Sequence, residues 1–321
     1  MLKIPIPSYL IVNEYFSMIK DAVTTSVCSS SLNSSAKDFL SSKKIEEIIT
    51  DSASKLLEHH NQIIPQLGQG FSIKEYEEYY KIKNKKKKNG VERSLFNKYH
   101  QKTAELFNVF DYDKLISHNQ GNSYRLAEML NRNTCTYCNR LYTIMIKKEK
   151  KYIARPQFDH WYAKKKYPVL ALSFFNLIPS CSVCNSSIKG NKVFSIDKHL
   201  HPYLKENDES LRFTYSIKSL KDYEIVIESK GDKTIETVKD LELEAVYQAH
   251  SKYELKELLD LRQKYSKNYI KFLFDELKST GVTEEEVYRL IFGIESKEED
   301  FHKRPFSKFK HDIIEEIRRN I

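Results

Sequence analysis

Four of the five cysteines form two C-x2-C pairs, Cys135/Cys138 and Cys181/Cys184. Each C-x2-C turn directs two thiolates at one ion, so two such turns predict the closed tetrahedral four-cysteine site that is typical of structural zinc. A closed shell leaves no coordination position for a substrate, and we therefore expect this zinc to stabilise the structure rather than to perform chemistry. The 42 residues from 139 to 180 exceed the usual spacing of a zinc ribbon, which predicts a small subdomain between the two turns.

Other interpretations of these cysteines remain open. Five is an odd number, which argues against a full disulfide framework. A redox dithiol is disfavoured because such a motif is a single C-x-x-C that opens a helix, whereas this chain has two pairs. The remaining alternative is four unrelated buried cysteines. Cys28 stands apart in a serine-rich stretch, and we expect it to be a free thiol with no chemical role.

The composition of the 321 residues favours a well-packed protein with a largely helical surface. Hydrophobic residues make up 40% and charged residues 30%, while glycine and proline number only eight each. These values argue against disorder. No run of about 18 apolar residues occurs, so we expect no membrane-spanning helix and a cytoplasmic protein. The net charge of +9 suits a partner that carries phosphates.

The pattern along the chain divides it into three segments. Residues 1–122 indicate a helical lobe, including one helix from Lys43 to Ile64 with apolar residues at helical spacing. Residues 123–205 break this rhythm and hold both cysteine pairs. Residues 206–321 alternate as strands of a small meander before helices return. We therefore expect an α+β, mostly helical protein in which a central zinc-bound module lies between helical lobes.

Several local signals accompany this division. Ser123 is the expected cap of a helix that leads into the first cysteine pair. A turn at residues 230–232 is expected to lead into a short third strand. Thr283 and Glu286 form a capping-box pattern. A broad, mainly apolar stripe is expected on a long C-terminal helix, at Leu255, Leu258, Leu259, Arg262, Tyr265, Tyr269, Phe272, Leu273 and Leu277.

An unusual series of polar residues lies between the cysteine pairs and just after them. FDHW covers residues 158–161, FFNLIPSC covers 174–181 and CNSSIKGNK covers 184–192. An Asp-His pair, a central Asn and an Asn after the second turn, followed by Lys-Gly, resemble the HNH endonuclease family with its ββα-metal fold. The sequence motifs TCTYCNR, FDH, NLIPSCSVCN and HPY are similar to those of HNH proteins from bacterial anti-phage systems, including Septu-type and retron-associated ones. The resemblance covers residues 135–203.

The chemistry of phosphodiester hydrolysis explains these residue types. One hard divalent cation stabilises the developing charge and the leaving oxygen, and Mg²⁺ or Mn²⁺ needs only one or two protein oxygen ligands. Asp159 offers a carboxylate, and Asn185, which stands where the family name has histidine, still offers an amide oxygen. His160 is of a type that is neutral near pH 7 and can act as general base. The resemblance implies that Asn176 orients this histidine through its side-chain amide.

Lysines near this series are candidates for contacts with a phosphate backbone. The alternative for each is a solvated basic surface. His199 and His201 lie in KHLHPY, and we expect His201 to pack under the site, with a role in binding a second metal as the alternative. The candidates for phosphate contacts are Lys164, Lys165 and Lys166, then Lys189 and Lys192, and a basic loop from Lys85 to Lys88.

The residues and the resemblance together predict a metal-dependent HNH endonuclease that cuts DNA as the effector of a bacterial anti-phage system. A regulatory ATPase partner is implied by the resemblance alone. A homodimer would suit double-strand cutting, although no residue demands it. Two alternatives remain open: a non-catalytic zinc-stabilised module that binds nucleic acid or protein, and an HNH nuclease that acts on RNA.

Overall fold

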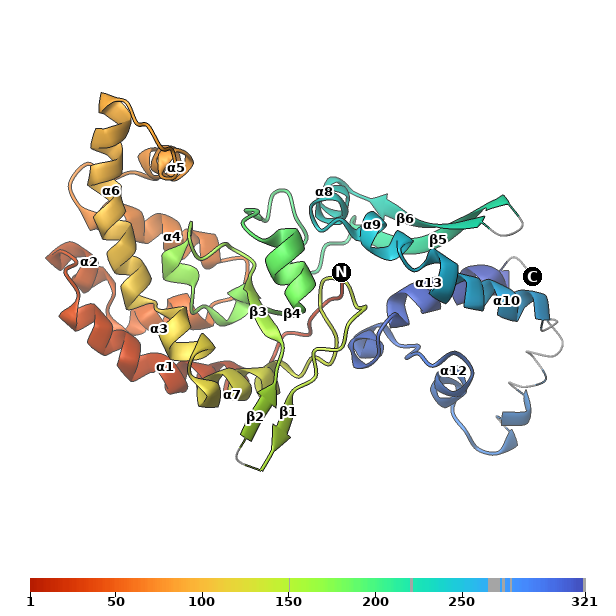
Figure 1. Ribbon diagram of the computed structural model, residues 1–321. Coiled ribbons are helices and arrows are strands. Elements are labelled where there is room, and N and C mark those ends of the chain that lie inside the picture. The colour runs from red at the N-terminus through yellow and green to blue at the C-terminus, as the bar shows by residue number, and fades with distance from the viewer. Residues whose placement is uncertain (150, 220–221, 265–271, 273–274, 278, 320–321) are drawn as a thin grey trace.

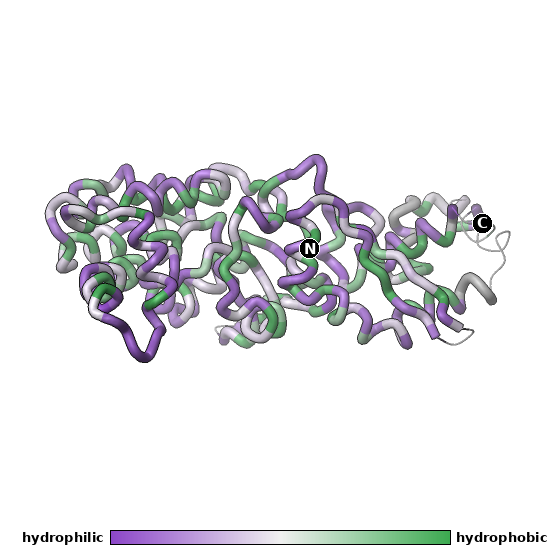
Figure 2. Tube along the Cα trace, turned by 90° about the horizontal axis from the view of Figure 1, so that it is seen from above, coloured by the Kyte–Doolittle hydropathy of each residue, from purple (hydrophilic) through white to green (hydrophobic). Residues whose placement is uncertain are grey.

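The computed structural model describes residues 1–149, 151–219, 222–264, 272, 275–277 and 279–319 of the chain. The fold is α+β and 55% helical with small antiparallel sheets, which confirms the expected class. The molecule is elongated: the N-terminal helices gather at one end, the cysteine-bearing segment lies in the middle, and the last strand pair and helices form the other end (Figure 1, Figure 2). No helix in the described part of the chain is long and apolar enough to cross a membrane.

Helices build the N-terminal end of the molecule. The first of them buries Val12, Phe16, Ile19 and Val23, which lie three or four residues apart and therefore share one face of the helix. The elements of this end are α1 (Tyr9–Ser29), α2 (Ser34–Phe39), α3 (Ser42–Thr50), α4 (Leu56–Ile63), α5 (Ile73–Ile82), α6 (Gly90–Val109), the π-helix Asp113–Ser117 and α7 (Gln120–Leu130).

The single helix expected from Lys43 to Ile64 is two helices, α3 and α4. Asp51 ends α3 with an extended backbone, and Ala53 in the following turn is buried. The carboxylate of Asp51 accepts a hydrogen bond from His59 Nε2 at 2.8 Å. Apolar spacing alone missed the break because the buried alanine continues the apolar pattern through it.

The start of α7 also differs from the expectation, since Ser123 is not its cap. The side chain of Asn119 accepts a hydrogen bond from the backbone nitrogen of Asn122 at 3.1 Å and caps the helix at Gln120. Ser123 is buried inside the first turn. An asparagine therefore takes the capping position four residues earlier than the serine.

Two short strand pairs form the middle of the molecule. In the second pair, Asp159 lies opposite Ile178 and His160 lies opposite Leu177. The second strand of that pair leads directly into the second cysteine turn and a π-helix, so two strands and one helix surround the polar series. The elements are β1 (Ile146–Lys148) with β2 (Lys151–Ala154), β3 (Gln157–His160) with β4 (Leu177–Ser180), and the π-helix Val183–Lys189.

The C-terminal part contains one hairpin followed by helices. The capping box of Thr283 and Glu286 is confirmed at the start of its helix. Of the expected apolar stripe, Leu255, Leu258 and Leu259 are buried, Phe272 is exposed, and Tyr265, Tyr269 and Leu273 lie outside the described residues. The elements are β5 (Ser210–Ser219), β6 (Asp222–Lys230), α8 (Asp232–Asp240), α9 (Leu243–Gln248), α10 (Lys256–Lys264), α12 (Glu284–Phe292) and α13 (Ser307–Arg319).

The expected third strand after residues 230–232 is helix α8. Gly231 turns the chain with a φ of 89°. The carboxylate of Glu209 accepts hydrogen bonds from the backbone nitrogens of Lys233 and Thr234, at 3.3 and 2.7 Å. Because these nitrogens have no partner inside the first helical turn, a carboxylate supplied by a distant residue favours the helix here.

Asn139, directly after the first cysteine pair, fastens the C-terminal end to the middle of the molecule. Its side-chain nitrogen donates to the carbonyls of Phe301 and Arg304 at 2.9 and 3.1 Å, and its side-chain oxygen accepts from the Lys308 backbone nitrogen at 3.2 Å. Its own carbonyl accepts from the Phe306 nitrogen at 2.7 Å. The residue is buried with a φ of 50°, a conformation that asparagine tolerates better than most residues.

We expect Asn139→Ala to lower the free energy of unfolding by about 2–4 kcal/mol, because buried carbonyls lose their donor and alanine is strained at positive φ. Urea denaturation measures the loss. Asn131→Ala is the matched control, since Asn131 also has a positive φ, of 42°, but is exposed. An equal loss in both variants would mean that the side-chain contacts contribute nothing.

Candidate metal centre and adjoining cavity

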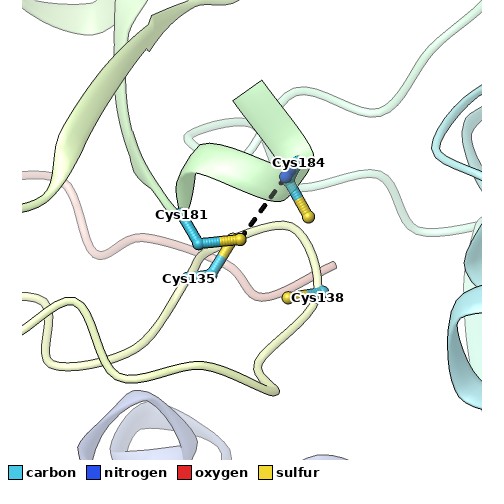
Figure 3. Close-up of side chains that lie close together, drawn as sticks. All are labelled: Cys135, Cys138, Cys181 and Cys184. Atoms are coloured by element: carbon cyan, nitrogen blue, oxygen red, sulfur yellow. Dashed lines mark hydrogen bonds between the residues drawn. The ribbon is translucent and has the colours of Figure 1, made fainter. Parts of the chain in front are cut away.

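The four paired cysteines come together in one buried cluster. One ligand atom from each lies within 4.8 Å of every other. Cys135 and Cys138 come from the loop after α7, whereas Cys181 and Cys184 come from the end of β4 and the start of the π-helix (Figure 3). Backbone nitrogens point at two of the sulfurs: Cys184 N donates to Cys181 Sγ at 3.4 Å, and Arg140 N donates to Cys138 Sγ at 3.5 Å.

This cluster fits a tetrahedral metal ion. Zinc–sulfur bonds of ~2.3 Å place the sulfurs about 3.8 Å apart, which the observed spacing allows. Burial raises the pKa of the Cys135 thiol well above its usual value, so four thiolates in this space require a cation to offset their charge. The cluster could therefore hold a metal ion such as zinc. It is the one group of three or more such ligand residues found within the described ranges.

The first cysteine turn also contacts the polar series. Tyr137, which lies between Cys135 and Cys138, is fully buried and donates its hydroxyl hydrogen to Asp159 Oδ2 at 2.5 Å. The backbone nitrogen of Thr136 donates to the Pro179 carbonyl on β4 at 3.1 Å. The metal cluster thus positions a carboxylate outside itself. Sequence reasoning did not single out Tyr137, because an aromatic residue inside a C-x2-C turn has no distinctive signal.

A cavity of about 400 Å³ lies beside the cluster, between β3, the loop that follows it and the π-helix. Asp159, His160 and Asn185 all line this cavity, so the structure brings together the three residues expected to surround a hard cation. Sequence reasoning missed several other lining residues, whose positions depend on the loop path. The residues that line it are Tyr112, Ser117, Arg155, Gln157, Phe158, Asp159, His160, Ala163, Lys164, Lys165, Asn185, Ser186, Lys189, Gly190 and Asn191.

His160 is held with one ring nitrogen facing a carbonyl. Its Nε2 lies 3.0 Å from the Ala171 carbonyl oxygen, which can only accept, so the neutral ring carries its hydrogen on Nε2 and its lone pair on Nδ1. The ring of Tyr112 packs edge-on against it, with centroids 4.4 Å apart. Burial, followed by the nearby charge of Lys164, lowers the pKa of His160 to about 4. The imidazole is therefore neutral at pH 7.

Lys189 is a buried partner of Asp159 and not a surface lysine. Its side chain is 1% exposed, and its Nζ lies 2.9 Å from Asp159 Oδ2. It also donates to the His160 carbonyl at 2.8 Å. The contact of Lys189 with a phosphate backbone stays a prediction, but the alternative of a solvated basic surface is wrong for this residue, because its side chain is buried against Asp159.

Asn176 lies under the site and does not touch the His160 ring. Its side-chain oxygen accepts from the Tyr162 backbone nitrogen at 2.7 Å, and its side-chain nitrogen donates to the carbonyls of Tyr162 and Leu170, at 3.1 and 2.9 Å. Leu170 precedes Ala171, whose carbonyl faces His160. Asn176 therefore holds the backbone of the loop next to Ala171, and its expected hydrogen bond to His160 is absent among the described residues.

Asn185 is half-buried on the π-helix at the rim of the cavity. Its side-chain nitrogen donates to Oε1 of Gln157, the first residue of β3, at 2.9 Å. This bond fixes which end of the amide faces the neighbouring strand. Asp159 and Asn185 thus supply a carboxylate and an amide from two different elements.

The remaining candidate lysines divide by their partners. Lys165 is exposed at the cavity, with no carboxylate partner among the described residues. The other three have partners, namely Lys164 with Asp113 at 2.7 Å, Lys166 with Glu77 at 2.7 Å, and Lys192 with the Asp240 carbonyl at 2.5 Å. Lys164 contacts both carboxylate oxygens of Asp113 and is only partly exposed, so its charge is offset at the cavity, whereas that of Lys165 is not offset by a described carboxylate.

Both histidines of the KHLHPY stretch are structural. His199 Nε2 bonds Asp240 Oδ2 at 2.9 Å, and its ring stacks on Phe194. His201 packs against Trp161 with ring centroids 4.5 Å apart, and burial lowers its pKa to about 3. The packing expected for His201 is confirmed.

Comparison with known proteins adds no further information on these residues. No protein-family model matches the chain, and neither a curated protein nor a solved structure matches it. The geometry of the cysteine cluster and of the cavity is therefore the basis for a functional proposal.

We expect Cys135→Ser to lose bound zinc and to unfold at a temperature at least several degrees lower, because metal binding of such sites is coupled to folding. Elemental analysis and a thermal melt measure the two effects. Cys28→Ser is the matched control, since Cys28 is an exposed free thiol. A Cys135→Ser protein that contains no zinc and melts like the wild type would contradict a structural metal.

We expect Lys189→Met to lower the free energy of unfolding by about 3–5 kcal/mol, since it leaves the buried charge of Asp159 without its lysine. The double variant Lys189→Met/Asp159→Asn should recover part of this loss, because it removes both charges. Urea denaturation of the two proteins and of Lys192→Met gives the comparison. A double variant that is no more stable than the single one would show that the ion pair is not the cause.

Proposed function

We propose that this chain is a metal-dependent HNH endonuclease that hydrolyses phosphodiester bonds in DNA. The observation that carries the proposal is that Asp159, His160 and Asn185 line one cavity. Metal-assisted hydrolysis of a phosphodiester requires a general base and oxygen ligands for the ion, and these residues offer an imidazole lone pair and two oxygen donors. The proposal also agrees with the net charge of +9.

The oxygen donors at the cavity suit a hard divalent cation. Asp159 and Asn185 would hold Mg²⁺ or Mn²⁺, which takes oxygen ligands and keeps several waters. When bound, such an ion supplies charge stabilisation for the phosphate oxygens. Tyr137 and Lys189 already orient the Asp159 carboxylate from two sides, so little rearrangement of that side chain is required.

His160 would act as general base through Nδ1. It takes a proton from the attacking water as the new oxygen–phosphorus bond forms and the bond to the leaving oxygen breaks. Because the Ala171 carbonyl accepts the hydrogen bond of Nε2, Nε2 stays protonated and the lone pair on Nδ1 is the one that would accept the proton. Lys165 and Arg155, which both line the cavity, would bind flanking phosphates.

The biological role that we propose is the effector nuclease of a bacterial anti-phage system, with a regulatory ATPase as partner. This part rests on the resemblance of residues 135–203 to HNH proteins of such systems. The ATPase would hold the nuclease inactive until infection. Purification of the chain from its native host tests whether an ATPase is bound. A monomer without any associated ATPase would contradict the proposed partner.

We expect wild-type protein to cleave plasmid DNA in Mg²⁺ or Mn²⁺ and His160→Ala to be at least about 100-fold slower, because the general base is lost. Gel electrophoresis of the plasmid measures the rate. His118→Ala serves as control, since His118 is exposed and does not line the cavity.

The outcome of this assay also separates the alternatives. Wild-type protein that binds the plasmid without cutting it would favour a non-catalytic zinc module. A labelled RNA that is cut faster than a labelled DNA of the same sequence would assign the same residues to an RNA nuclease.

A further inference from the structure

A second cavity, of about 600 Å³, adjoins the catalytic one. It lies between helices α5 and α6 and the loop that joins β3 to β4. Lys165 and Asn191 line both cavities, so the two lie next to each other. We call this second cavity the aromatic groove, and the residues that define it here are Tyr80, Lys83, Phe96, Phe107, Lys165 and Asn191.

Lysines lie over the partly exposed rings of the aromatic groove. A cation over an exposed aromatic ring contributes only about 0.5–1 kcal/mol, so these contacts break easily. Four pairs of this kind occur among the described residues, with Nζ-to-centroid distances of 4.1 Å for Lys83 over Tyr80, 5.6 Å for Lys166 over Tyr80, 4.5 Å for Lys88 over Phe96 and 5.6 Å for Lys164 over Phe107.

Lys83 and Lys165 add positive charge to the groove. Lys83 Nζ donates to the Lys165 carbonyl at 2.9 Å, which brings together two lysine runs that are 82 residues apart. Neither Lys83 nor Lys165 has a carboxylate partner among the described residues. Burial and the charge of Lys165 lower the pKa of Lys83 to about 8. An anion bound beside Lys83 and Lys165 would offset the repulsion between their charges.

We propose that the aromatic groove binds unpaired nucleotides of the nucleic-acid strand whose phosphate enters the catalytic cavity. This inference rests on the proposed function and names the substrate class of that site: a single-stranded or locally opened nucleic acid. The lysines form ion pairs with the phosphates next to the cleaved bond, and the bases stack on the aromatic rings.

The energies favour this exchange. Stacking of a base on an aromatic side chain contributes about 1–3 kcal/mol, more than the cation–ring contact that it replaces. The displaced ammonium then pairs with a phosphate. Bases of a continuous duplex are stacked within the helix and cannot reach the rings, so the groove selects strands whose bases are free.

Binding of fluorescein-labelled oligothymidylate tests the inference, measured by anisotropy with the full-length His160→Ala chain without added Mg²⁺. We expect Tyr80→Leu and Phe107→Leu in this background each to weaken binding roughly 5- to 150-fold, which corresponds to one lost stacking contact. Tyr253→Leu is the matched control, because Tyr253 is a ring 69% exposed elsewhere on the molecule. The control should bind as tightly as the parent chain.

An abasic oligonucleotide of equal length supplies a second measurement on the unaltered groove. We expect it, and a duplex of the same length, to bind at least fivefold more weakly than oligothymidylate. Equal binding of the abasic strand, or unchanged binding by both leucine variants, would overturn the inference. An oligouridylate probe distinguishes RNA from DNA as the source of the strand.

The two proposals fail separately. If the wild-type chain cuts no nucleic acid but the rings still govern oligothymidylate binding, the groove stands and the nuclease does not. If plasmid is cut in a His160-dependent manner while the leucine variants bind normally, the nuclease stands and the groove does not.

Discussion

The convergence of four cysteine sulfurs is the constraint on which the rest of the structure depends. The cluster joins the loop after α7 to the end of β4, two places separated by more than 40 residues of chain. Three neighbours of the first turn extend its reach: Tyr137 contacts Asp159, Thr136 pairs with β4, and Asn139 binds the segment before α13. The hydroxyl of Tyr247 adds a fourth connection, at 2.5 Å from the Cys138 carbonyl.

The electrostatics of the cavity follow from burial. Asp159 is 4% exposed and carries a charge that would be costly without partners, which Tyr137 and Lys189 supply. His160 is buried beside it and stays neutral for the same reason. The Asp159 carboxylate is thus paired and still lines the cavity, where the proposed divalent ion would bind. Tyr137 thus connects the four-cysteine cluster, which could hold a metal ion such as zinc, to the carboxylate of the proposed catalytic site.

The polar series shows how far sequence reasoning reaches. The spacing of the cysteines predicted one four-cysteine cluster, and the resemblance to the HNH family implied that Asp159, His160 and Asn185 lie near each other. Short-range signals were less reliable where a distant residue decided the outcome. Glu209 favours helix α8 over the expected strand because it contacts the backbone of the first turn from a distant position in the chain. The buried Ala53 hid the end of α3 because it continues the apolar pattern through the turn.

The amino-acid sequence by itself determined the metal-binding turns, the residue types at the site and the mostly helical class, since these depend on local spacing and composition. Only the tertiary structure decided which lysines are available. It buried Lys189 against Asp159, and it placed the lysine run at 83–88 beside the run at 164–166. The sequence alone does not distinguish a buried, paired lysine from a free one. The role of a charged side chain depends on the groups that folding brings within a few ångströms of it.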